Sequence, residues 1–399
     1  MRLRSNRFGV WVLLLVSLAA RADIVADWSD WTTTIATEGP NTVRTMALAQ
    51  SAVYEAVNAV TSRYPRAQVD LGLASGSSIE AAVAAASRTI LLHEAPALKD
   101  RTEAAYARAL EKIPQGDARM SGVSLGERAA ADVLAKHSDD IGNIEPYRPL
   151  TTPGVYVPTT FPLGYTFAQH KPWFMKSAAQ FRPAAPPALK SALWARDYNE
   201  IKAIGSASST VRTPEQTEIA RFWASSLPNI YMGLVRSFAT VSGRDVTRNA
   251  RLYAAVTGAM NDAEIAALEA KYHYSFWRPI TAIRNGDRDG NSSTDRDPDW
   301  TPLTTTPLNP EYPCANCMMA AMVITIMRAD AGGEALPPLS TVSNTAPGVT
   351  RRWLQAEDVI QEVSAARIYA GVHFRTSTEV GNRMGDQVGR LVAAAYGLH

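Results

Sequence analysis

The sequence predicts an all-α protein, built as a helical bundle or a pair of bundles. Apolar residues recur at the spacing of helix faces along most of the chain. No segment shows a convincing alternation of apolar and polar residues, which would indicate half-buried strands. A helix start at Thr213 supports this class, because a capping residue there precedes Pro214 at the first helical position and Gln216 at the third.

The expected elements follow one another in chain order. Residues 23–40, which carry two tryptophans, are expected to form an extended arm. Residues 42–60 are rich in alanine, so a helix there would pack tightly on its neighbours. Further helices are predicted at residues 78–93, 97–113, 122–137, 188–204, 214–225, 231–241, 245–272 and 318–327.

Residues 141–187 interrupt this helical pattern. Prolines occur so often in this stretch that no helical spacing of apolar residues continues for long, and aromatic residues lie between the prolines. This composition favours an ordered loop that walls a site. A domain linker is the alternative, although linkers are rarely so aromatic.

Composition narrows the class of protein. The chain has 399 residues and is 46% hydrophobic, enough for a large core in one or two domains. Its net charge is +2 and it has no long basic run. A nucleic-acid-binding protein should present a strongly basic surface, so this function is not expected.

The N-terminus is typical of a secretory signal peptide. Three arginines precede an apolar run at residues 10–20, and Ala20-Arg21-Ala22 fits a small-x-small cleavage site. We therefore expect a signal peptide at residues 1–22, a single helical domain at residues 23–399, and a secreted or periplasmic protein. The rival interpretation is an uncleaved N-terminal anchor. No later stretch is apolar for long enough to span a membrane.

The two cysteines, Cys314 and Cys317, form a Cys-x-x-Cys pair. In an oxidising compartment the pair could be a disulfide or a thiol-redox motif. A c-type haem site would need histidine after the second cysteine, where Met318 stands. A structural zinc site would need further ligands from elsewhere.

Residues 285–299 form a polar, acidic stretch that begins like a calcium-binding EF-hand loop. The position that needs a bidentate glutamate holds Arg296 instead. A solvated turn is therefore favoured over a calcium site.

A first candidate site segment runs from Lys271 to Pro279. Lys271 and Arg278 are seven residues apart, two helical turns, so both cations could emerge on one face. Aromatic residues fill the interval between them. Two cations aimed one way from an aromatic frame suit an oxyanion such as phosphate or vanadate. The alternative is a helix end whose cations pair with surface carboxylates.

Two later segments point the same way. Residues 313–317 lead directly into an apolar helix. The free N–H groups at the start of this helix could bind an anion; the alternative is an ordinary helix N-terminus without a ligand. Arg367 and His373 are six residues apart, about 240° around a regular helix. Gly371 suggests that the helix ends or bends there, which would let both side chains converge. The alternative for His373 is a histidine of the core that forms its hydrogen bonds with neighbouring residues and has no functional role.

Together the three segments resemble the vanadium-dependent haloperoxidases, which share a superfamily with type 2 phosphatidic acid phosphatases and bacterial acid phosphatases. The family pattern has Lys, six residues and Arg-Pro; then Pro-Ser-Gly-His; then Arg, five residues and His. Lys271 with Arg278-Pro279 matches the first part, and Arg367 with His373 matches the third. The local sequence around Phe276-Trp277 resembles the chloroperoxidase type more than the lipid phosphatases.

The resemblance implies two four-helix bundles in one globular domain, with the oxyanion site in the C-terminal bundle. It implies vanadate as cofactor, with phosphate as an alternative occupant, and hydrogen peroxide and a halide, or a phosphate ester, as substrates. His373 would bind vanadium, or attack phosphorus in a phosphatase. The oxyanion would be held by Lys271, Arg278, Arg367, the Ala315 N–H and, more weakly, the Cys314 sulfur.

The sequence departs from the family in the second segment, where Cys314-Ala315-Asn316 replaces Ser-Gly-His. Asn316 stands in the acid–base position but cannot exchange a proton near neutral pH. His273 or another side chain would have to replace it. The aspartate expected a few residues after the last histidine is also missing, since Ser377 occupies its place.

Four functions remain open from the sequence. The favoured one is an exported haloperoxidase-like oxidoreductase, weakened by Asn316. A phosphatase with His373 as nucleophile is the second, and a non-enzymatic oxyanion-binding protein is the third. A thiol-redox protein based on the two cysteines is the fourth.

Overall fold

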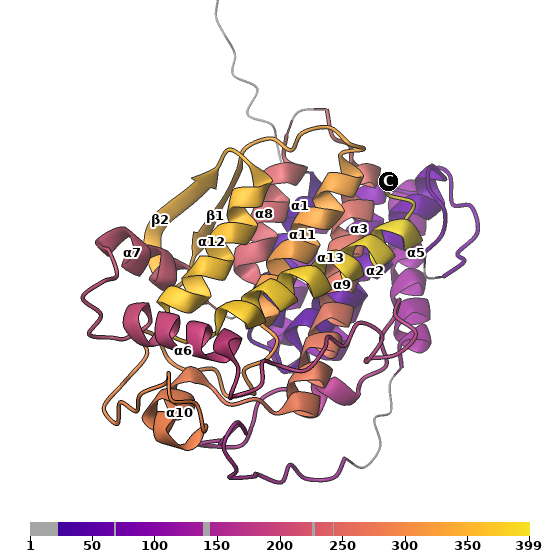
Figure 1. Cartoon of the computed structure of the whole chain (residues 1–399). Helices are drawn as coiled ribbons and strands as arrows, with labels where there is room; N and C mark the ends of the chain where they lie inside the picture. Colours follow the sequence, from indigo (N-terminus) through magenta and orange to yellow (C-terminus); the bar gives the residue numbers. More distant parts are fainter. Residues whose placement is uncertain (1–22, 68, 139–143, 226–227, 242) are drawn as a thin grey trace, which may run out of the picture.

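The computed structural model describes residues 23–399 except residues 68, 139–143, 226–227 and 242, and over these residues the chain is mainly helical (Figure 1). The α-helices are α1 (Ile24–Ala36), α2 (Thr42–Thr61), α3 (Ile79–Glu94), α4 (Lys99–Glu111), α5 (Asp117–Lys136), α6 (Ala192–Ile204), α7 (Pro214–Phe222), α8 (Asn229–Ala239), α9 (Val246–Tyr274), α10 (Pro279–Arg284), α11 (Ala315–Asp330), α12 (Ala356–Tyr369) and α13 (Arg375–Ala395). The strands are β1 (Leu339–Ser343) and β2 (Ala346–Trp353), and three short 3-10 helices are η1 (Pro96–Leu98), η2 (Phe167–Gln169) and η3 (Gly286–Arg288). The predicted, mainly helical class is confirmed.

Helix α9 is the longest helix and is buried along most of its length. It packs against α2, α11 and α13 (Figure 1). A helix whose faces are nearly all apolar must be covered by other elements, and α9 satisfies this by running between its neighbours. Its last turn carries Lys271, so the packing of α9 places that cation inside the protein.

Asp262 on α9 attaches the proline-rich loop of residues 141–187 to the helix. Its carboxylate accepts hydrogen bonds from the backbone N–H groups of Trp173, Phe174 and Met175, at 2.7, 2.8 and 2.8 Å. Over its described residues the loop contains no α-helix and only η2 as regular structure, as its prolines predict.

The prediction of an extended arm at residues 23–40 is wrong, because α1 forms there. Asp23 caps this helix by accepting a hydrogen bond from the Ala26 N–H at 2.9 Å. The threonines and isoleucines of α1 have modest helix propensity. Burial of Trp28 and Ile35 in contact with α2 and α3 outweighs that preference.

The expectation of a structure without strands is also wrong. Strands β1 and β2 form an antiparallel hairpin in which Leu339 pairs with Trp353. The Thr341 hydroxyl donates a hydrogen bond to the Ile230 carbonyl at 2.8 Å and so seats the hairpin on α8. A side chain at Gly233 would collide with Thr341, which shows how closely the two elements approach. Most of β2 is exposed, so its residues carry no clear apolar alternation.

The remaining predicted helices are present with shifted ends. Helix α5 begins at Asp117 instead of residue 122, and α11 begins at Ala315 instead of residue 318. The segment predicted as one helix at 97–113 is η1 followed by α4. The predicted cap at Thr213 is confirmed as a full capping box with Gln216.

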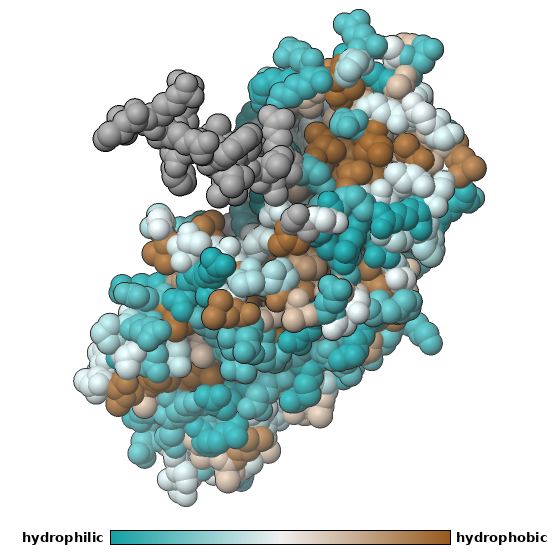
Figure 2. Space-filling view, turned by 90° about the horizontal axis from the view of Figure 1, so that it is seen from above, coloured by the Kyte–Doolittle hydropathy of each residue, from teal (hydrophilic) through white to brown (hydrophobic). Residues whose placement is uncertain are grey.

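The predicted signal peptide at residues 1–22 lies outside the described residues. Within the described part of the chain, no helix combines the length and apolarity needed to cross a membrane. The face shown in Figure 2 is mainly polar, with apolar residues in scattered patches. Such isolated apolar residues are normal on a folded surface.

The acidic stretch at residues 285–299 is closed by hydrogen bonds to Asp289. This buried carboxylate accepts from the Trp194 indole N–H and the Thr294 hydroxyl, both at 2.7 Å, and from the Asn291 N–H at 2.8 Å. Among the residues that the structure describes, no three His, Cys, Asp or Glu side chains gather so that they could hold a metal ion. Asp289 thus ties the loop to α6.

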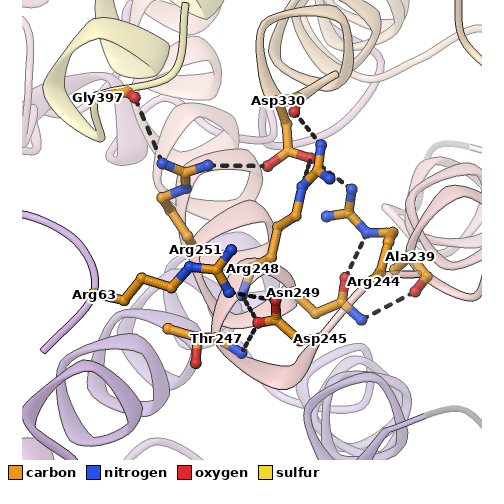
Figure 3. Close-up of polar contacts among 10 residues, drawn as sticks. All are labelled: Arg63, Ala239, Arg244, Asp245, Thr247, Arg248, Asn249, Arg251, Asp330 and Gly397. Carbon is orange, nitrogen blue, oxygen red and sulfur yellow. Dashed lines mark hydrogen bonds and ion pairs between the residues drawn. The ribbon is translucent and has the colours of Figure 1, made fainter. Parts of the chain in front are cut away.

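A buried charge cluster joins the start of α9 to the end of α11 (Figure 3). Asp330, whose side chain is fully buried, lies 2.6 Å from Arg244 Nη1, 3.2 Å from Arg248 Nε and 3.6 Å from Arg251 Nη2. The Asp330 carboxylate therefore forms ion pairs with three guanidinium groups. Removing one partner of a buried ion pair strongly destabilises the fold, because the remaining charge is buried without compensation.

Asp330→Asn is therefore expected to lower the free energy of unfolding by about 3–5 kcal/mol. Denaturant unfolding followed by circular dichroism measures this change. The matched control is Glu357→Gln, which removes a half-exposed ion pair with Arg328 at 2.9 Å and should cost about 1 kcal/mol or less. Equal effects of the two substitutions would contradict the structural role of Asp330.

Candidate oxyanion site

Lys271 and Arg278 lie at the junction between α9 and α10. Helix α9 ends at Tyr274, and Ser275 closes it with a left-handed backbone (φ 44°) and a hydrogen bond to the Lys271 carbonyl at 2.7 Å. Arg278 is the N-cap residue of α10. The expectation that both cations share one face of one helix is therefore wrong; the turn between the two helices places them in one cavity.

Both cations are buried and held by backbone carbonyls. Lys271 Nζ donates to the Pro310 and Glu311 carbonyls at 2.7 and 2.9 Å. Arg278 donates from Nε and Nη2 to the carbonyl and side-chain oxygens of Asn309, at 2.8 and 2.7 Å. Burial, with the charge of Arg278 beside it, holds the pKa of Lys271 well below its usual value. Burial lowers the pKa of Arg278 to about 10.

Arg367 and His373 are brought together by the end of α12. The helix stops at Tyr369, and Gly371 takes a φ of +78° before the chain reaches His373. A side chain at Gly371 would also collide with the Gly205 carbonyl, so glycine is required on both grounds. The predicted break at Gly371 is confirmed.

His373 faces Arg278 on one side of its ring. Arg278 Nη1 lies 3.2 Å from His373 Nε2 and also donates to the Val372 carbonyl at 2.9 Å. A guanidinium group can only donate, so Nε2 must be the unprotonated nitrogen of this contact. Burial, followed by the charges of Arg278 and Lys271, holds the pKa of His373 well below its usual range. His373 is therefore a neutral imidazole with a lone pair on Nε2.

Glu311 is the site residue that the sequence analysis missed. Its Oε1 accepts from His373 Nδ1 at 2.9 Å and from the Phe374 N–H at 3.0 Å. Burial raises the pKa of Glu311 to about 7, against the opposing charges of Arg278 and Lys271. Glu311 belongs to none of the three segments of the family pattern. The only feature of the sequence that could have indicated it is its position two residues before Pro313.

The carboxylate–histidine pair fixes the histidine tautomer. Glu311 accepts a hydrogen bond from Nδ1–H, so the lone pair is on Nε2, which could bind a metal or attack an electrophile in place of its contact with Arg278. Glu311 is thus the carboxyl partner of His373, and Ser377 stands at the position where an aspartate was expected. Ser377 lies beside Glu311 and lowers its pKa.

The cysteine pair is present as two free thiols, both fully buried, so the disulfide alternative is wrong. Cys314 caps α11 by accepting a hydrogen bond on Sγ from the Cys317 N–H at 3.3 Å. Burial raises the pKa of the Cys314 thiol, but hydrogen bonds from Cys317 and the charge of Arg367 outweigh this and bring it to about 7.

A cavity of about 320 Å³ connects these groups. Lys271, Arg278 and His373 lie on its wall, together with Ala315 and Asn316 at the start of α11. Cys314 and Arg367, which were expected to contact the oxyanion, are buried and do not line the cavity, so that expectation is wrong for direct contact. The cavity therefore joins a cationic group of side chains to the N-terminal end of a helix, where backbone donors favour anions.

Asn316 provides hydrogen bonds but no acid–base group. The Tyr231 hydroxyl lies 3.0 Å from Asn316 Oδ1 and 3.1 Å from its carbonyl oxygen. Burial raises the pKa of Tyr231 well above its usual value, so this phenol does not release a proton near neutral pH. His273 is exposed and lies beside Gln169 and His170 in a separate hollow, so it does not replace the missing histidine.

The charge of the site fits an oxyanion. Lys271, Arg278 and Arg367 are buried around a single carboxyl group, Glu311. Arg367 donates from Nη1 to the Trp223 carbonyl at 2.7 Å, while its buried Nε has no hydrogen-bond partner among the described residues. An excess of buried positive charge is stabilised by an anion such as vanadate or phosphate.

Part of the chain matches a known protein family. The family model described as the VCPO second helical-bundle domain matches residues 251–397, which include all of these candidate residues except Tyr231. The vanadium chloroperoxidase of Curvularia inaequalis is 29% identical over 199 residues, 40% of this chain. That match spans 32% of the relative, about a third of its length.

Solved structures share the fold over nearly the whole chain. A bacterial vanadium-dependent iodoperoxidase superposes with a TM-score of 0.79 at 21% identity, covering 93% of this chain and 96% of its own. The holo form of a bacterial vanadium-dependent chloroperoxidase gives a TM-score of 0.71 at 17% identity, covering 95% of each chain. The chain therefore shares the fold of these bacterial vanadium-dependent haloperoxidases, and residues 251–397 resemble the second helical-bundle domain of the family model.

Proposed function

We propose that the protein is a vanadate-dependent haloperoxidase that uses hydrogen peroxide to oxidise a halide. The observation that carries this proposal is the neutral imidazole of His373, whose Nε2 lone pair lies among buried cations. His373 would bind vanadium, and Lys271 and Arg278 would hold the vanadate oxygens with the N–H of Ala315. Arg367, which does not line the cavity, would add its positive charge. Bound vanadate would supply a Lewis acid that polarises peroxide for attack by a halide.

The chain's own residues prepare the site for this chemistry. Glu311 keeps the proton of His373 on Nδ1, so that Nε2 stays available as a ligand. The buried guanidinium groups and the lysine offset the negative charge of the oxyanion in surroundings of low polarity, where their effect is larger than in water. The carbonyls that hold Lys271 and Arg278 fix these donors before any ligand arrives.

The same geometry supports a phosphatase as the alternative, because the Nε2 lone pair could attack phosphorus. Asn316 would offer no proton to the leaving group in that reaction. It also supports an oxyanion-binding protein with little turnover. Activity measurements on one preparation separate these functions.

Two broader features belong to the same proposal. Helix α2 packs against α3, α5 and α9. Helix α9 packs against α11 and α13, and α12 packs against both of these. This arrangement supports two four-helix bundles that share α9. The arginines and apolar run of residues 1–22 support export to the periplasm or the medium.

The first experiment measures vanadate binding by calorimetry, followed by oxidation of bromide or iodide with peroxide and by hydrolysis of a phosphate ester. His373→Ala should weaken vanadate binding by more than about 100-fold, since it removes the direct ligand. His93→Ala, an exposed histidine paired only with Glu94, is the matched control and should bind normally. Unchanged affinity in His373→Ala would exclude this residue as the ligand.

Glu311→Gln should weaken vanadate binding by about 10–100-fold, the usual effect of removing a partner that orients a metal-binding histidine. The amide keeps the shape of the side chain but no longer attracts the Nδ1 proton as a carboxylate does. Nitrogen NMR of His373 would report the tautomer directly. A variant with normal affinity and an unchanged tautomer would exclude the positioning role of Glu311.

Asn316→His should raise the turnover of halide oxidation by about 10²–10⁴-fold, if loss of the acid–base group limits the reaction. The rate at saturating peroxide and halide is the measurement, with vanadate affinity as the control for an intact site. No gain in rate despite normal vanadate binding would show that proton transfer at residue 316 is not limiting.

A further inference from the structure

One acidic side chain lines the cavity among its described residues, and the proposed oxyanion site does not use it. Glu264 lies on α9, two helical turns before Lys271, which is about 10 Å along the helix. Met260, Ala267 and Leu268 line the cavity beside it, at the spacing of a single helix face. The cavity thus extends along α9, from a cationic end to an acidic wall.

Nothing in the described structure neutralises Glu264. It makes no hydrogen bond or ion pair with another described residue, whereas Asp262, two residues earlier, accepts three backbone N–H groups. Burial alone raises the pKa of Glu264 to about 7, with no cation to lower it. Glu264 is partly exposed, and it lies on the wall of the cavity. A carboxylate that is partly removed from water and has no cation beside it would gain binding energy from a cation that enters this cavity.

The cavity around Glu264 is suited to a small apolar molecule. Leu163 and Phe167 from the long loop, Val43 from α2 and Met319 from α11 complete the wall with apolar side chains. A molecule with a cationic end would be oriented by charge, because Glu264 attracts a cation while Lys271 and Arg278 repel it. Its apolar body would then extend toward the oxyanion end.

We propose that Glu264 binds the ammonium group of an aromatic amine substrate, the organic acceptor of the halogen. This inference rests on the proposed function for the reaction, but the binding site itself stands on the cavity and its carboxyl group. In the reaction, hypohalous acid transfers its halogen to an aromatic carbon in exchange for that carbon's proton, and water is released.

The test compares two probes that differ in one charge: tyramine and 4-ethylphenol, which share a phenol ring and a two-carbon arm. Calorimetry with the full chain at pH 8, without vanadate, should show tyramine binding at least about tenfold more tightly. Glu264→Gln should remove this preference while leaving the affinity for 4-ethylphenol in place. Glu218→Gln, an exposed glutamate on α7, should keep the preference.

The preference should also depend on pH. Glu264 is charged above its pKa of about 7, so the advantage of tyramine should shrink at pH 5.5 and grow at pH 8. Tyr231, Lys271, Arg278 and His373 are the other titratable groups on the cavity wall. Deprotonation of Lys271 at higher pH would also favour an amine, and Glu264→Gln, which keeps Lys271, separates the two effects.

Equal binding of the two probes, or a tyramine preference retained in Glu264→Gln, would overturn the inference. The thermal midpoint of Glu264→Gln should not fall, because the substitution removes a partly exposed carboxyl group that has no partner among the described residues. Vanadate binding and halide oxidation are measured separately on the same protein. Their failure would contradict the proposed function, whereas a tyramine preference that needs Glu264 would still establish the amine site.

Discussion

The burial of three cations around one neutral imidazole is the constraint on which the site depends. Lys271, Arg278 and Arg367 are all shielded from water, and each donates to at least one carbonyl oxygen, which does not neutralise its charge. Burial lowers the pKa of Lys271 and of His373, which shows how strongly the interior resists further positive charge. An oxyanion relieves this strain, and His373 must stay neutral to bind it through Nε2.

The architecture serves this constraint by bringing distant segments to one end of α9. The chain turns sharply after Tyr274, α12 stops before Gly371, and α11 starts at the cavity wall. At the opposite end of α9, Asp330 collects three arginines and ties α9 to α11 (Figure 3). The helix that carries Lys271 is thus held at both ends, so the donors of the site are fixed by the fold.

Glu311, which is fully buried, and Glu264, which is partly exposed on the cavity wall, show two different uses of a carboxyl group. Both have a pKa raised to about 7 by burial, yet only Glu311 has cations and a histidine around it. Glu311 is therefore a positioning residue for His373. Glu264 faces the cavity without such partners, which makes it a group for recognising a ligand. The different neighbours, and not the residue type, separate the two roles.

The sequence by itself determined the helical class, the capping box at Thr213, the break at Gly371 and the spacing of the cationic residues, because periodicity and capping depend on neighbouring residues. Only the tertiary structure decided that Glu311 meets His373, 62 residues later, and that Glu264 faces the same cavity. It also turned residues 23–40 into a helix and formed the β1–β2 hairpin. Those outcomes depend on packing between segments far apart in the chain, which local patterns do not encode.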